Sequence, residues 1–398
     1  MLTHPCLEQL QKMRLTGMLK ALKEQLQLED YQAMTFEERL GLMLDREITE
    51  AAQTMGASPL RAFFTVVVPI LRPAMVTAWI ILFVFTMGAL VTPQWLGKPE
   101  HWMFANHIAS EVFERGNVPF GPDAGEGWSG MSTIHAVTRS VRDSAALLDA
   151  TGGGDVGAPY SAPAKERPYL EEVGRTPEGL RIALVTDSFN GTEVHADCAE
   201  AAEDAAQLCE SLGHRIEPIT LKVDREALGG ATQAIIGGNV RATVERRAAT
   251  LGREPGPDDL EPFTQRMYEA AANASAADYA RGQLAIHAAG RVVASVLESY
   301  DLILTPTMGA PPEKLGVLSL ANENLGAMIG ALLRSVAFTQ LINGTGQPAI
   351  SLPLHWNAAG LPIGAHFVAA LGGEGLLYRL AGQLEAERPW FDRVPEMS

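Results

Sequence analysis

The chain has 398 residues, of which 47% are hydrophobic and 20% charged, a composition typical of a folded globular protein. Its 47 acidic residues outnumber its 31 basic ones, so the net charge is -16. This balance lacks the basic surface that nonspecific nucleic-acid binding requires, and we expect no nucleic-acid partner. The first 50 residues carry many charges and no apolar stretch of a secretion signal, so we expect a cytoplasmic protein.

The cysteines and histidines give no sign of a metal site. Cys6, Cys198 and Cys209 are odd in number and widely spaced, which predicts neither a disulfide framework nor a zinc site. The nine histidines are scattered, and no HExxH motif occurs. We therefore expect no metal and no cofactor.

Residues 1–48 form a polar leader with apolar residues at helical spacing, from Leu7 to Leu26. A capping box at Thr35–Glu38 predicts a second helix from about Phe36 to Glu47. The leader resembles the N-terminus of the IstB-type helper ATPases of IS21-family insertion sequences. ATP binding there requires a phosphate loop, but no GxxxxGK[ST] motif occurs and Asp155 follows the only glycine triplet, so we expect no ATPase function.

Residues 49–120 contain an uncharged stretch of 18 residues, from Ala74 to Val91. A spanning helix needs about 20 residues, so two interpretations stay open: a transmembrane helix or a buried helix of a soluble domain. Glu50–Ala52, Gly56 and Pro69 resemble the EAA motif of ABC importer permeases. We interpret 49–120 as a permease-like fragment. One or two apolar segments cannot form a transport path, so membrane association through Ala74–Val91 is the remaining expectation for this segment.

Residues 121–398 have the alternating strands and helices of an α/β protein. Ser140 is placed to cap a helix that ends at Gly152, because Asp143 follows it at capping-box spacing. Beyond this helix, the predicted elements are a strand at 181–186, a helix at 197–212, a strand at 215–220, a helix at 276–300, strands at 301–305, 347–354 and 361–369, and a helix at 374–388.

Several blocks of this stretch resemble the C-terminal part of the amidase signature family. They are Gly121–Trp128, Thr138–Ala145, Tyr300–Thr307, Asn343–Ala349, Gly360–Gly364, Leu384–Glu385 and Arg388–Trp390. The resemblance implies an α/β/α sandwich with a mixed sheet, acting on small-molecule amides. The opening block is most similar to the branch that includes aminohexanoate-cyclic-dimer hydrolases.

The same resemblance implies a Lys–Ser–Ser triad and a glycine-serine loop that supplies the oxyanion hole. Both lie N-terminal to the block that matches Gly121, and this chain has neither. Ser129 misses the GxSxG frame because Met131 stands in place of the second glycine, and no pattern favours Lys98 or Lys165 as a base. We therefore assign no catalytic residue.

Three residues are candidates for substrate binding: Asn343, Thr345 and Gln347. They are predicted to line the remaining pocket wall, with turn residues before a strand as the alternative. The resulting hypothesis is an amidase-family hydrolase by descent that is inactive. The alternatives are a membrane-associated permease fragment, or a chimeric or decayed reading frame without selected function.

Overall fold

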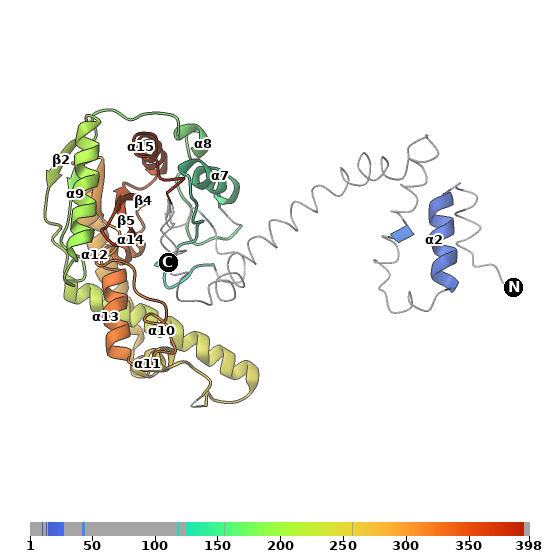
Figure 1. Ribbon diagram of the computed structural model, residues 1–398. Helices are drawn as coiled ribbons and strands as arrows, with labels where there is room; N and C mark the ends of the chain where they lie inside the picture. Colours follow the sequence, from blue (N-terminus) through green and yellow to red (C-terminus); the bar gives the residue numbers. More distant parts are fainter. Residues whose placement is uncertain are drawn as a thin grey trace. The chain divides into compact units, whose positions relative to one another are not determined.

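The computed structural model describes residues 10, 13, 15–27, 42–43, 118, 125–154, 156–256 and 258–393. The chain divides into two compact units, Met1–Lys98 and Pro99–Ser398, and each is considered by itself (Figure 1).

In the first unit, helix α2 spans Thr16–Gln27 and confirms part of the leader prediction. Leu22 on this helix is buried, whereas Leu26 is 48% exposed, so the buried face is narrower than the leucine spacing predicts. Of the second predicted leader helix only Leu42 and Met43 are described, and both are helical. The apolar stretch Ala74–Val91 lies outside the described residues.

The second unit is built on a five-stranded sheet in the order β2-β1-β3-β5-β4. Strand β1 runs parallel to β2 and β3, whereas β5 runs antiparallel to β3 and β4, so the sheet is mixed, as predicted. The strands are β1 (Arg181–Leu184), β2 (Arg215–Pro218), β3 (Leu302–Pro306), β4 (Ala349–Trp356) and β5 (Pro362–Ala369).

Helices cover both faces of this sheet. Because side chains alternate along a strand, Leu302 and Leu304 of β3 join one core and Ile303 joins the other. The first core holds apolar residues of α7, α9 and α15, and the second holds those of α12 and α14, which gives the expected α/β/α layers. The helices are α7 (Val141–Thr151), α8 (Tyr169–Glu172), α9 (Ala196–Ser211), α10 (Arg225–Leu251), α11 (Pro262–Ala270), α12 (Ala276–Leu297), α13 (Leu325–Ser335), α14 (Thr339–Thr345) and α15 (Glu374–Glu387).

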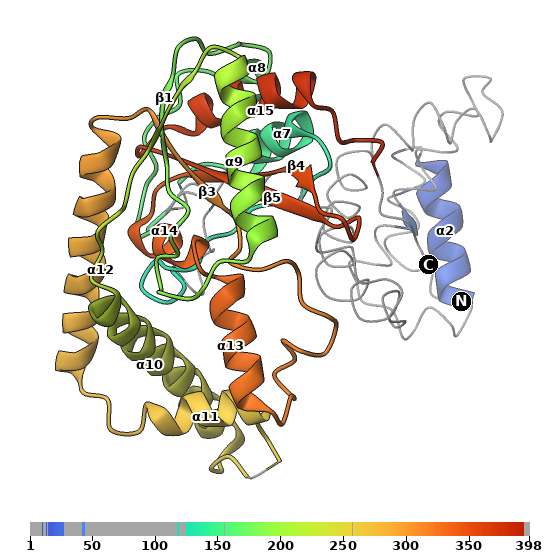
Figure 2. The same cartoon turned by 60° about the vertical axis from the view of Figure 1, so that its left-hand side comes forward.

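Helices α10 and α11 extend the unit beyond its sheet, and Figure 2 shows them at the end opposite α8. The helix α10 was not predicted, because its paired glycines weaken the helical pattern. Its partner is α12, and the two backbones approach closely where a Cβ on Gly282 would lie 3.2 Å from the Cα of Ala231. Tertiary packing at this small-residue contact therefore stabilises a helix that local propensity does not favour.

Candidate functional site

A surface pocket of about 320 Å³ lies between α12 and the end of α14, which lie side by side in Figure 2. Thr345 and Gln347, two of the three predicted substrate-binding residues, line it, and Asn343 is not among the lining residues. The pocket is lined by Ile286, His287, Gly290, Arg291, Ala294, Gly344, Thr345 and Gln347.

The local structure of α14 explains which predicted residues reach the pocket. The helix ends at Gly346, whose φ of +86° suits glycine and whose N–H donates to Ile342 O at 2.8 Å. Asn343 and Thr345 therefore lie on a helix and not in a turn, whereas Gln347 lies between α14 and β4, as the alternative of turn residues before a strand expected. The Thr345 Oγ1 lies 3.0 Å from Leu341 O and also contacts Gln347 Oε1, which fixes the two side chains against each other.

The loop that contains Ser129, the serine that misses the GxSxG frame, contacts helix α12. Gln283 of α12 donates from Nε2 to the Ser129 Oγ at 2.6 Å. Trp128 and Ser129 both have positive φ, 51° and 59°, which non-glycine residues rarely adopt, and Gly130 continues the run at 77°. The loop is thus held in an uncommon conformation next to α12, and sequence patterns gave no signal of this contact.

Of the two lysines considered as bases, Lys165 does not line this pocket. Lys165 forms an ion pair with the Asp149 carboxylate at 2.5 Å, and its ammonium lies 5.0 Å from the centre of the Tyr169 ring. This contact lowers the pKa of Asp149, against the effect of burial. Lys98 lies outside the described residues.

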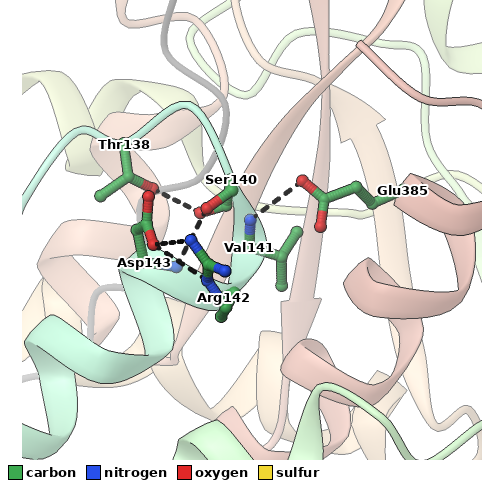
Figure 3. Close-up of polar contacts among 6 residues, drawn as sticks. All are labelled: Thr138, Ser140, Val141, Arg142, Asp143 and Glu385. Atoms are coloured by element: carbon green, nitrogen blue, oxygen red, sulfur yellow. Dashed lines mark hydrogen bonds and ion pairs between the residues drawn. The ribbon is translucent and has the colours of Figure 1, made fainter. Parts of the chain in front are cut away.

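Two blocks that carry the family resemblance meet at the start of α7, as Figure 3 shows. The Ser140 Oγ accepts a hydrogen bond from Asp143 N at 3.1 Å, which confirms the predicted cap. The Val141 N–H donates to Glu385 Oε1 of α15 at 3.1 Å, and burial raises the pKa of that carboxyl. Trp390 Nε1 donates to Arg139 O at 3.0 Å, so the segment after α15 is fastened to the same turn.

Burial shifts the pKa values of several titratable groups. Burial lowers the pKa of His366 on β5 to about 4, and its Nδ1 lies 3.1 Å from the Thr305 Oγ1. Burial also lowers the pKa of His135 to about 4, and this ring contacts the Ser144 Oγ at 3.2 Å. Glu374 at the start of α15 has its pKa raised to about 7 by burial. No local sequence pattern indicates these groups, because burial depends on the tertiary fold.

The described residues contain no group of three or more His, Cys, Asp or Glu side chains that could hold a metal ion. Cys198 and Cys209 are both buried on α9, and burial raises the pKa of each thiol to about 12. Thiols with such high pKa values are poor nucleophiles at neutral pH.

Among the residues that the structure describes, no single helix is long and apolar enough to cross a bilayer. Only α13 and α14 taken together have that length and apolar character, and they are bent by 68° relative to each other.

Two family profiles match separate parts of the chain. The profile described as Amidase matches residues 119–378. The profile described as a binding-protein-dependent transport system inner membrane component matches residues 42–117, which supports the permease-like prediction for that segment.

Curated relatives and solved structures agree with the first match. The chain is 33% identical over 298 residues to a 6-aminohexanoate-cyclic-dimer hydrolase of Pseudomonas sp. (strain NK87), covering 71% of this chain and 59% of the relative. It is 28% identical over 273 residues to a putative amidase of Synechocystis sp., covering 69% of this chain and 50% of that relative. A structure of 6-aminohexanoate cyclic dimer hydrolase complexed with substrate superposes with a TM-score of 0.67 at 30% identity, covering 73% of this chain and 62% of that one.

The chain therefore spans about three fifths of the length of the first of these relatives. A bacterial aryl acylamidase of the amidase signature family, at 20% identity and a TM-score of 0.61, shares the fold. The amidase profile covers more than half of the chain. The chain belongs to the amidase family.

Proposed function

We propose that residues 119–378 retain the binding wall of an amidase, that they bind a small amide between α12 and α14, and that the chain does not hydrolyse it. One observation carries the proposal: the amidase match begins at residue 119, directly after the transport-component match ends at 117. In the family that the sequence resembles, the Lys and the glycine-serine loop precede the block at Gly121. In this chain, the residues before that block match the transport-component family instead.

The chemistry of the pocket also supports a chain that binds an amide but does not hydrolyse it. Amide hydrolysis by serine needs a base that removes the hydroxyl proton and preorganised donors for the oxyanion. The residues that line the pocket include neither a serine nor a lysine. Ser129, on the neighbouring loop, contacts the neutral amide of Gln283 rather than a base.

Thr345 and Gln347 are the groups we assign to amide recognition. Gln347 Oε1 is engaged by the Thr345 hydroxyl, which leaves the two Nε2–H donors of Gln347 for an amide carbonyl. The apolar side chain of Ile286 and the open surface of Gly290 give a short aliphatic chain room to pack. A small aliphatic amide, of the chemical class named in the 6-aminohexanoate relatives, fits this arrangement.

The test uses the full-length protein and 6-acetamidohexanamide as the probe. Isothermal titration calorimetry is expected to detect binding, while chromatography detects no release of acetate or ammonia. A fluorophosphonate probe is expected to leave the protein unlabelled, with an intact amidase as the positive control. Turnover or labelling at a single serine would overturn the assignment of an inactive chain.

A matched pair of variants locates the binding. Gly290→Leu fills the pocket and is expected to abolish binding, because the new side chain projects beside Thr345, whose Cβ lies 3.7 Å from a Cβ built at Gly290. Ala288→Leu enlarges an exposed residue of the same helix that does not line the pocket, and is expected to bind as the wild type does. Equal binding by both variants would place the ligand elsewhere.

The transport-component match at 42–117 supports a second candidate, a membrane-associated fragment held through Ala74–Val91. Membrane partitioning of the expressed chain separates this candidate from the first. If Ala74–Val91 holds the chain in the membrane, deletion of 74–91 is expected to release the protein to the soluble fraction.

A third candidate is a chimeric reading frame. Single-molecule sequencing of source DNA across codons 45–55 and 115–125 tests it, since reads that never span both joins would identify the chain as an artefact.

A further inference from the structure

The polar side chains that line the α12/α14 pocket can all donate hydrogen bonds, and one of them, that of Arg291, can only donate. His287 and Arg291 lie one turn apart on α12 and both line the pocket. Gln347 adds its two Nε2–H donors, because its Oε1 is already engaged by Thr345. No aspartate or glutamate is among the lining residues.

The excess of donors stands out against the charge of the protein. The chain carries a net charge of -16, and most of its surface therefore repels anions. Among the residues that the structure describes, neither His287 nor Arg291 pairs with a carboxylate, whereas Arg281 of the same helix is paired with Asp278 at 2.5 Å. Within the described part of the chain, the guanidinium of Arg291 therefore has no carboxylate partner, and the lining of its pocket includes no acidic residue.

We infer that this pocket takes a carboxylate, and that its ligand is an amide that also bears a carboxylate group. The inference rests on the proposed amide-binding function and specifies its substrate class. A planar guanidinium presents two parallel N–H donors that match the two oxygens of a carboxylate, and such paired contacts are stronger than neutral hydrogen bonds. The Nε2–H groups of Gln347 then donate hydrogen bonds to the amide carbonyl of the ligand.

This specificity differs from that expected of a site for a neutral cyclic amide. A cyclic dimer of an amino acid has no free carboxylate, since both carboxyl groups are used in its amide bonds. A linear amide with a free acid end has one, and the pocket offers it Arg291. Ile286 and Ala294 lie on the same face of α12 and provide the apolar contact for the chain between the two polar ends.

The test compares two probes that differ in one group, 6-acetamidohexanoate and 6-acetamidohexanamide, by isothermal titration calorimetry with the full-length protein. We expect the acid to bind about tenfold more tightly than the amide, because it alone makes a charge-assisted contact. Arg291→Gln is expected to remove this preference, because it weakens the binding of 6-acetamidohexanoate more than that of 6-acetamidohexanamide. Arg291→Lys is expected to retain part of the preference, since the charge remains but the fork is lost.

Arg281→Gln is the matched control, because it removes the same charge from the same helix at a position outside the pocket. It is expected to keep the tenfold preference. Equal binding of the two probes by the wild type, or loss of the preference in both arginine variants, would overturn the carboxylate inference and leave the amide pocket in place. Failure of both probes to bind would overturn the proposed binding function together with it. Tighter binding of inorganic phosphate than of 6-acetamidohexanoate would also overturn the inference, by making the site a phosphate site.

Discussion

The backbone N–H of Val141 donates to the carboxylate of Glu385 across 244 positions of sequence, at 3.1 Å (Figure 3). The contact joins the first turn of α7 to the last turns of α15. The N–H groups in the first turn of a helix have no partner within it, so an acidic side chain from elsewhere can satisfy one of them. Two of the blocks that carry the family resemblance are thereby explained by one structural role, fastening α7 to α15.

Removal of the Glu385 carboxylate should weaken this junction. Glu385→Ala is expected to lower the free energy of unfolding by about 1–2 kcal/mol, because a half-buried N–H loses a charged acceptor. Glu385→Gln keeps an acceptor oxygen and should cost less. Urea denaturation followed by circular dichroism measures both, with the exposed Glu387→Ala on the same helix as the control. An equal loss in all three variants would argue that the Val141 contact contributes nothing specific.

Ser140 tests the cap of α7 separately. Its Oγ accepts from Asp143 N at 3.1 Å, so Ser140→Ala is expected to cost about 1 kcal/mol. Ser140→Gly should cost only a few tenths of a kcal/mol, because glycine at a cap leaves the first amides open to water. The order of the two variants in thermal or urea unfolding is the measurement. A glycine variant less stable than the alanine variant would contradict the cap assignment.

Much of this region was predictable from the sequence. The cap at Ser140 and the strands β3, β4 and β5 all follow from local patterns that the structure confirms. The helix α10 was missed, since its stability depends on the close contact of Ala231 with Gly282 on α12, and single-sequence patterns do not report such pairings.

The candidate site was predicted only in part, for a related reason. Thr345 and Gln347 were found because they lie in a block that resembles a known family, and the structure places both in the pocket. His287 and Arg291 were missed because charged residues one turn apart on a helix usually form a solvated face. Only the position of α14 beside α12 turns that face into a pocket wall.

His366 should make the stability of the fold sensitive to acid. Burial lowers its pKa from 6.5 to about 4, so between these values the unfolded chain binds more protons than the folded one. Stability is therefore lost as the pH falls from about 6.5 to 4, by roughly 3 kcal/mol at most from this group. Glu374, with its pKa raised to about 7, contributes in the opposite direction between 4.5 and 7.

The pH dependences that His366 and Glu374 contribute to the free energy of unfolding overlap. The informative measurement is therefore the difference in this free energy between the wild type and a variant. The free energy of unfolding of the wild type minus that of His366→Gln should increase as the pH rises from 4 to 6.5, whatever the two absolute values. A slope for His366→Gln that matches the wild type would show that His366 is not held neutral by burial.

Two glycine-to-alanine changes in helices should have opposite effects. A Cβ on Gly382 of α15 would lie 2.1 Å from the backbone oxygen of Val173, a distance that no side-chain rotation relieves. Gly382→Ala is therefore expected to destabilise the fold by about 2 kcal/mol or more, despite the better helix propensity of alanine. Gly230 of α10 has nothing within 4 Å of the same position, so Gly230→Ala should stabilise by about 0.5–1 kcal/mol. The measurement is the free energy of unfolding of each variant. A Gly382→Ala protein as stable as the wild type would mean that α15 does not pack on Val173, after α8. A destabilised Gly230→Ala protein would mean that this face of α10 is covered.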